Sequence, residues 1–201
     1  MNHTKWTDEH LKTLNPCANG YEWYAKNCRD KGIDNTAQII DLLIKDDRLE
    51  WANWTIARAL SGENRIRYAI FAAEQVIDIF ERKYPKDDRP RKAIEAAKAV
   101  LKNDNEKTKS AAADSADSAG LAAWSAWSAA DSADSADSAG LAAWSAGFAA
   151  RSAESARSAA WSTAESAGLA AWSATWSAES AAESAMKEKI IRYGVGLLKK
   201  D

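Results

Sequence analysis

The sequence predicts an all-α fold, in which a small N-terminal helical domain (1–104) continues into a stack of closely packed helices rich in Ala, Ser and Trp (105–201). Three observations predict it. Apolar residues in the first half recur at intervals of three and four, as on one face of a helix. No stretch alternates polar and apolar residues with a period of two, as a half-buried strand would. The second half is dominated by alanine, the residue with the highest helix propensity.

Apolar periodicity predicts five short helices in the N-terminal half. One of them is TAQIIDLLIKD, and the next, LEWANWTIARAL, places Trp51 and Trp54 three residues apart on one face. The stretch ENRIRYAIFAAEQVIDIFERKYP predicts a single helix from 63 to 84 that stops at Pro85. Pro90 begins RPRKAIEAAKAVLKND at a first-turn position, where a helix needs no N–H group.

The second half is predicted to fold although it lacks most ordinary core residues. The 75 residues from 111 to 185 include 31 alanines, 17 serines and no proline, whereas disordered segments have few aromatic residues and abundant proline. The serines recur about every 3.45 residues, close to the 3.5-residue repeat of helices packed in a supercoil. Small Ala and Ser faces let helices approach closely, and Trp rings supply buried area. The aromatic residues of this tract are Trp124, Trp127, Trp144, Phe148, Trp161, Trp172 and Trp176.

The phrase A-G-L-A-A-W occurs three times in the tract, at 119–124, 139–144 and 167–172. On one straight helix, the 20 residues between the first two copies would turn the second copy by about 200°, to the opposite side. A motif with a fixed role is not expected on opposite sides of one helix, so separate helices are favoured. Their expected spans are near 121–139, 141–167 and 169–193.

Glycine marks the expected ends of these helices. Gly just after a helix adopts the left-handed conformation, and a following Leu contacts the preceding turn. The alternative places the glycines inside longer helices, where a neighbouring backbone comes close, at a cost of about 1 kcal/mol each relative to alanine. The sequence favours helix ends and leaves the alternative open. The residues concerned are Gly120, Gly140, Gly168 and Gly194.

Aromatic and acidic side chains of the tract are the candidate partner-binding residues. Nine acids and two arginines give residues 111–185 a net charge of −7, in a chain whose net charge is −2. We expect the acids on the solvent side, and a Trp left unburied between helices would anchor a protein partner. The candidates are Trp124, Trp127, Trp161, Asp131, Asp134 and Asp137.

The sequence offers no catalytic constellation, and we expect no enzyme, no cofactor and no metal site. His3 and His10 lie near the N-terminus, where fraying is expected, and no serine occurs in a G-x-S-x-G or S-x-x-K context. The acid pairs at 46–47 and 87–88 are expected to cap helix starts rather than to bind a cation. Cys17 and Cys28 lack C-x-x-C spacing, which favours reduced structural cysteines over a disulfide or a metal site.

Charge and hydropathy also restrict the expected partners. The basic residues between 65 and 92 are interleaved with acids, so direct nucleic-acid binding is not expected. No apolar run is long enough to span a membrane, and MNHTKWTDEH lacks the apolar segment of a signal peptide. We therefore expect a cytoplasmic protein.

Four stretches carry a resemblance to a known family: NPCANGYEWY (15–24), LEWANWTIARAL (49–60), RIRYAIFAAEQVIDIFERKYPKDDRPRKAIEAAKAVL (65–101) and MKEKIIRYGVGLL (186–198). Together they resemble a bacterial and phage-borne family of immunity proteins, whose members also carry a long alanine-rich triplet tract before the last helix. The resemblance spans essentially the whole chain, but Ser and Trp stand here where those relatives have mostly Ala and Tyr. It implies a small cytosolic protein that neutralises an effector by binding it.

We therefore expect a non-enzymatic inhibitor that binds and neutralises a protein effector, either a toxin or a nuclease. One alternative is a phage-encoded, anti-CRISPR-like inhibitor that acts partly by acidic mimicry of nucleic acid. A second alternative is a self-associating helical scaffold, for which the partner would be another copy of the chain in a homo-oligomer.

Overall fold

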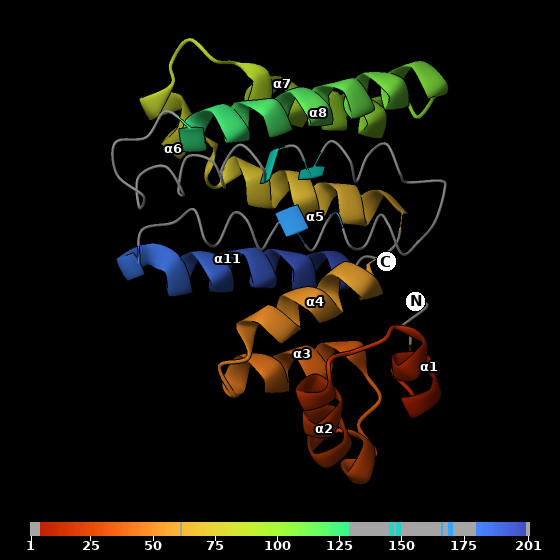
Figure 1. The fold of residues 1–201 in the computed structure, drawn as a ribbon. Coiled ribbons are helices and arrows are strands. Elements are labelled where there is room, and N and C mark those ends of the chain that lie inside the picture. The colour runs from red at the N-terminus through yellow and green to blue at the C-terminus, as the bar shows by residue number, and fades with distance from the viewer. Residues whose placement is uncertain are drawn as a thin grey trace.

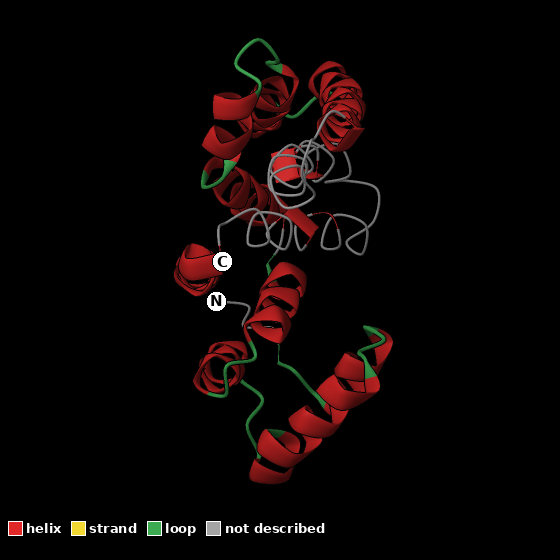
Figure 2. Ribbon diagram, turned by 60° about the vertical axis from the view of Figure 1, so that its left-hand side comes forward, coloured by secondary structure: helices red, strands yellow, loops and turns green. Residues whose placement is uncertain are grey.

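The computed structural model describes residues 5–60, 62–128, 145–146, 148–149, 166, 169–170 and 180–199. The fold is all-α, as predicted, and the described residues contain no strand beyond an isolated bridge between Lys5 and Asn35 (Figures 1 and 2). The α-helices are α1 (Asp8–Thr13), α2 (Ala18–Asn27), α3 (Thr36–Lys45), α4 (Leu49–Ala59), α5 (Gly62–Glu74), α6 (Ile77–Lys83), α7 (Arg89–Lys102), α8 (Glu106–Ser128) and α11 (Ser180–Leu198), and a 3₁₀ turn, η1 (Arg29–Lys31), follows α2.

The last helix joins the end of the chain to its N-terminal half. Helices α7 and α8 lie side by side at one end of the molecule and α1 to α3 at the other, with α5, α11 and α4 between them (Figure 1). Helix α11 packs against α3, α4 and α5, and residues from Trp6 to Leu197 belong to one hydrophobic cluster. The predicted domain boundary at residue 104 falls in the turn between α7 and α8. Among the described helices, none has the length and apolar character that a membrane crossing requires.

The prediction of five helices in the N-terminal half is wrong, because the described residues up to 102 form seven α-helices. The stretch from 63 to 84 is two helices, α5 and α6. At their junction, the N–H of Gln75 bonds to the carbonyls of both Phe71 (3.3 Å) and Ala72 (3.2 Å). The N–H of Val76 bonds to the carbonyl of Ala73 (3.2 Å). This tighter turn ends α5 and redirects the chain so that Val76 is fully buried.

The N-terminal segment is held in place, contrary to the fraying expected around His10. The side chain of Thr7 accepts the N–H of His10 at 3.2 Å and so caps α1. Trp6 is buried with its ring edge-on to Trp54, the two centroids being 5.9 Å apart. The hydroxyl of Tyr24 donates to the carbonyl of Trp6 at 2.5 Å. The contacts of Trp6 fasten it to α2 and α4.

Asp8, in the first turn of α1, links α1 to α2 and the turn after it. Its carboxylate lies 2.8 Å from Nζ of Lys12, accepts the Tyr21 hydroxyl at 2.7 Å and lies 3.4 Å from Nη1 of Arg29. Lys12 and Tyr21 together lower the pKa of Asp8 from 3.8 to about 2. Because the folded chain holds Asp8 ionised, these contacts stabilise the fold above pH 3.8, and the stabilisation is lost as the pH falls through about 2.

We therefore expect Asp8→Asn to lower the free energy of unfolding at neutral pH and to lose most of this effect near pH 2, where about half of the wild-type carboxyl is itself protonated. Urea unfolding of both proteins at several pH values measures the difference. Asp41→Asn, at an exposed position of α3 that makes no contact with another described charge, is the control and should change stability little at any pH. A constant difference between Asp8→Asn and wild type down to pH 2 would contradict this assignment.

Helix α8 confirms the expected packing role of small side chains. It packs along α7, whose buried residues include Ala93 and Ala97. Asp114 and Asp117 are exposed, as predicted for the acids of the tract. Among the residues of α8 whose side chains the structure describes, those buried apart from Lys109 are alanines that recur every three or four positions, namely Ala112, Ala116, Ala119 and Ala122.

Glycine does not end a helix at either of the two expected positions that the structure describes. Gly120 lies inside α8 and Gly194 inside α11, so the helix ends predicted there are wrong. A β-carbon on Gly194 would lie 2.6 Å from Cγ2 of Ile56 and 2.8 Å from Cε2 of Tyr68, so this glycine permits a close approach of α11 to α4 and α5. At Gly120 nothing lies within 4 Å, and the flanking alanines carry the helix through. Gly140 and Gly168 lie outside the described residues.

A buried serine links two segments of the Ala/Ser/Trp tract. The hydroxyl of Ser145 donates to the backbone carbonyl of Ala170 at 2.8 Å. Both residues are fully buried, and Ala146, Ala149 and Ser166 are buried as well. Ser145 therefore has the structural role expected for serines between closely packed helices.

Candidate functional site

The turn between α3 and α4 holds two charged side chains on a fixed backbone. Asp46 ends α3, and its carboxylate accepts the indole N–H of Trp23 at 2.7 Å. Asp47 has a left-handed backbone with φ 54°, and the N–H groups of Asp47 and Arg48 bond back into the last turns of α3. The expectation that Asp46 and Asp47 cap the next helix is wrong, because Arg48 occupies the cap position of α4 and no side chain caps that helix.

Arg48 is oriented by an aromatic ring rather than by an acid. Its guanidinium carbon lies 5.0 Å from the ring centroid of Trp51, within the range of a cation–π contact. Trp51 is half-buried and is itself held edge-on by Trp23 at 6.4 Å. Arg48 is exposed and makes no ion pair with any described residue. The turn therefore presents a positioned guanidinium whose N–H donors face solvent.

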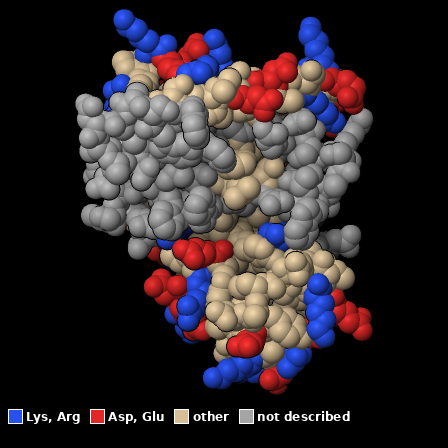
Figure 3. Space-filling model, viewed as in Figure 1, with Lys and Arg blue, Asp and Glu red and all other residues tan. Residues whose placement is uncertain are grey.

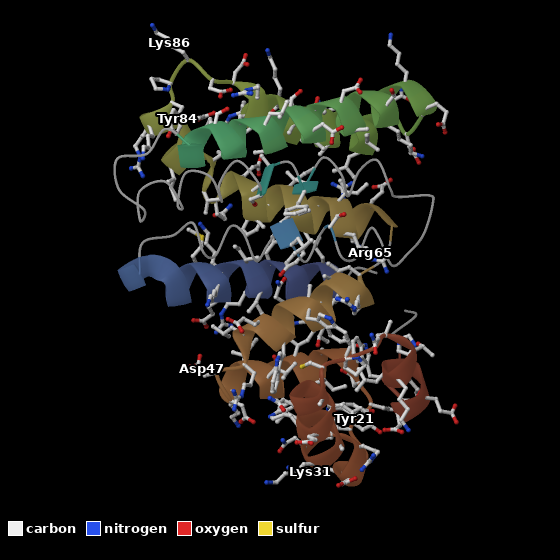
Figure 4. The ribbon with its side chains drawn as sticks, viewed as in Figure 1. Tyr21, Lys31, Asp47, Arg65, Tyr84 and Lys86 are labelled. Atoms are coloured by element: carbon white, nitrogen blue, oxygen red, sulfur yellow. The ribbon has the colours of Figure 1, made fainter. Side chains whose placement is uncertain are left out.

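Helix α11 brings a second cation to this turn and closes one side of a cleft of about 330 Å³. Nζ of Lys187 lies 3.8 Å from a carboxylate oxygen of Glu50. Asp47 lies at the turn between α3 and α4 (Figure 4), and charges of both signs are intermingled over this end of the molecule (Figure 3). The cleft is lined by Asp47, Arg48, Leu49, Glu50, Trp51 and Lys187.

The cations and the acids of the cleft differ in their exposure to water. The side chain of Lys187 is only 17% exposed, whereas that of Glu50 is 62% exposed, and Asp47 is exposed as well. Water therefore compensates the acids more completely than it compensates Lys187. The exposed guanidinium of Arg48 is therefore the group of the cleft that can donate to an incoming partner. Among the described residues, no group of three or more His, Cys, Asp or Glu side chains is placed to hold a metal ion.

Trp51 also lines a second, apolar cavity, together with Trp6, Trp23, Trp54 and Tyr24. This cavity measures about 40 Å³. That volume is enough for a few water molecules and far below that of ordinary ligand pockets. It is a packing gap in the aromatic cluster that supports the cleft.

The two cysteines are free and separate, as predicted. Cys17 is exposed, and its Sγ accepts the N–H of Gly20 at 3.3 Å at the start of α2. Cys28 is buried at the end of that helix, and burial raises the pKa of its thiol to about 11. Cys28 therefore stays protonated at neutral pH and serves packing.

The candidate partner-binding residues from the sequence lie away from the cleft or outside the described residues. Trp124 and Trp127 lie in the last turns of α8, where the structure describes the backbone but not their side chains. The other candidates, and His3 at the N-terminus, lie outside the described residues. These candidates are Trp161, Asp131, Asp134 and Asp137.

Arg48, Glu50 and Lys187 were not predicted as site residues from the sequence. One signal was present, since an Arg three positions before a Trp at a helix start lies on the same side of the chain as that ring. Nothing in the sequence placed Lys187 beside Glu50, because that contact depends on how α11 packs on α4.

Comparisons of the chain with protein-family models, with curated proteins and with solved structures gave no match.

Proposed function

We propose that this protein is a non-enzymatic inhibitor that binds a protein effector, a toxin or a nuclease, and neutralises it in the cytoplasm. The observation that carries the proposal is the guanidinium of Arg48 over the ring of Trp51, two residues that line the cleft. Arg and Trp are the residue types that dominate the energy of protein interfaces. A side chain already held in place also loses less conformational entropy when a partner binds. The resemblance to immunity proteins supports an effector as that partner.

The test is to co-express the protein with each of its neighbouring genes, one gene at a time. We expect one neighbour to arrest growth when produced alone and to be harmless when the two are produced together. Calorimetry on the purified pair should then show a direct complex. If no neighbouring product is relieved of toxicity or bound, the proposal fails. Light scattering of the protein alone is the accompanying control, since a stable homo-oligomer without an effector would favour a self-associating scaffold.

Exposed acids on α8 favour a second candidate, an anti-CRISPR-like inhibitor that imitates nucleic acid. Asp114 and Asp117 lie three residues apart on the solvent side of that helix. Mimicry that uses many acids should weaken steeply as salt rises, whereas binding through the cleft should depend on salt only weakly. The affinity of the complex, measured at NaCl concentrations from about 50 to about 500 mM, therefore separates mimicry from binding through the cleft.

A further inference from the structure

We infer that Asn19 is a site of covalent modification, at which the backbone nitrogen of Gly20 closes on the Asn19 side chain and water then leaves aspartate or isoaspartate in its place. The thiol of Cys17 controls the rate, and the isoaspartate product disturbs the support of Trp51. The Asn–Gly pair occurs once in the chain, in the first turn of α2. The reactants are two adjacent residues and water, so the modification requires no enzyme and no effector.

The reaction proceeds through a succinimide ring that joins residues 19 and 20. The nitrogen of Gly20 forms a bond to Cγ of Asn19, the bond from Cγ to Nδ2 breaks, and the proton of the Gly20 N–H leaves with the amide nitrogen as ammonia. Water then adds to one of the two ring carbonyls and breaks its bond to the ring nitrogen. Addition at Cγ gives aspartate, whereas addition at the main-chain carbonyl gives isoaspartate, in which the chain runs through Cγ.

Asn19 is better placed for this reaction than the other exposed asparagines that the structure describes. Its side chain is exposed and makes no hydrogen bond with a described residue, and Gly20 has no β-carbon to hinder the attacking nitrogen. Asn15 precedes Pro16, whose nitrogen carries no proton to release. Asn103 precedes Asp104, whose side chain crowds the nitrogen. Ring closure is therefore expected first at Asn19.

The cap of α2 decides how often the ring can close. Closure requires the backbone at Asn19 to rotate out of its helical conformation, so it occurs in the fraction of molecules whose first turn is open. The N–H of Gly20 has no carbonyl partner within the helix and bonds instead to Sγ of Cys17 at 3.3 Å. Sulfur is a weak acceptor, and cysteine is not among the preferred cap residues. The thiol therefore holds this turn closed only weakly.

The first turn of α2 lies against Trp51, which lines the cleft. A β-carbon on Gly20 would lie 4.0 Å from Cε2 of Trp51, and Trp23 of the same helix is edge-on to that ring. Isoaspartate adds a carbon atom to the main chain at residue 19, so the N–H of Tyr21 loses its bond to the carbonyl of Cys17 at 2.9 Å. The ring of Trp51 then loses part of its support, whereas aspartate leaves the path of the chain unchanged.

The first test follows both exposed asparagines in one sample of the full chain, kept at body temperature in mildly alkaline buffer. Peptide mapping by mass spectrometry detects the gain in mass when –NH₂ becomes –OH, and a methyltransferase specific for isoaspartate separates the two products. We expect conversion at Asn19 well before conversion at Asn103, which serves as the internal control. If Asn19 stays amidated for as long as Asn103, the inference is wrong.

The second test varies the cap. Cys17→Ala should convert about fivefold faster than Cys17→Ser, with the wild type between them, because a serine cap holds the first turn closed more firmly by about this factor. In concentrated urea the three proteins should convert at the same rate, since the cap no longer exists there. Equal rates in the folded proteins, or the same difference in urea, would show that the Cys17 cap does not control the reaction.

The third test asks whether the modification reaches the cleft. It uses the indole N–H signals of ¹⁵N-tryptophan-labelled protein, with Trp51 assigned from the signal lost in Trp51→Phe. We expect the Trp51 signal to shift in the isoaspartate fraction of aged protein and to stay in place in Asn19→Asp, the matched control, because an acid in the first turn suits a helix start. An unmoved Trp51 signal in the isoaspartate fraction would overturn the link to the cleft.

Discussion

Replacing Gly194 with alanine is expected to lower the free energy of unfolding by about 1–2 kcal/mol, the net of an overpacking cost of about 1–3 kcal/mol and a gain of up to about 1 kcal/mol in helix propensity. The new methyl group would lie 2.6 Å from Ile56 and 2.8 Å from Tyr68, closer than carbon atoms approach without repulsion. Both neighbours are fully buried on α4 and α5, so neither can turn aside into solvent. The clash can be relieved only by moving α11 away from them.

Gly196, two residues along the same helix, provides the matched control. It is exposed, and a β-carbon there meets nothing within 4 Å. Gly196→Ala should therefore stabilise the fold by up to about 1 kcal/mol, through propensity alone. Urea unfolding of both variants measures the difference, in which the propensity gain cancels. Equal stabilities for Gly194→Ala and Gly196→Ala would show that α11 does not approach α4 and α5 as closely as described.

The helices with strong apolar periodicity were predictable from the sequence. TAQIIDLLIKD and LEWANWTIARAL correspond to α3 and α4, and Pro90 lies in the first turn of α7. In these stretches, local propensity and the pattern of buried residues agree, so neither overrides the other. The structure adds the close packing of α11 on three earlier helices, which no local pattern encodes.

Helix ends were the least predictable feature, for two physical reasons. The glycines at 120 and 194 could either end a helix or permit a close contact inside one. Only the neighbouring side chains distinguish the two interpretations. Between α5 and α6 a helix ends without any residue that marks a helix end, since the junction at Gln75 and Val76 contains neither glycine nor proline. The chain turns there because it buries Val76, and that burial is a tertiary effect.

The candidate site was predictable only in part. Trp51 was visible as an aromatic residue of a helical face, but nothing in the sequence marked it as part of a site. The structure leaves Trp51 half-buried and places Arg48 over its ring. Lys187 and Glu50 are distant in sequence, and their contact follows from the packing of α11 against α4. A single sequence carries no signal of such a pair.

Enlarging one alanine of the buried row in α8 is the second change with a large expected effect. Ala112 is fully buried in the helix that packs along α7. Ala112→Leu adds three carbon atoms at a position with no exposed surface, so we expect the packed helices to separate or the new side chain to adopt a strained rotamer. We expect a loss of about 1–3 kcal/mol in the free energy of unfolding, and more if α8 detaches from α7.

Ala111→Leu is the control for this change, because it alters the same helix by the same atoms at the adjacent, exposed position. Alanine and leucine have similar helix propensities, and both variants make the same exchange. The difference in urea midpoint between Ala112→Leu and Ala111→Leu therefore reports the packing cost alone. We expect Ala111→Leu to stay within about 0.5 kcal/mol of wild type. If Ala112→Leu were as stable as Ala111→Leu, small side chains would not be what holds α8 against α7. The alanine-rich composition of the tract would then need an explanation other than close helix packing.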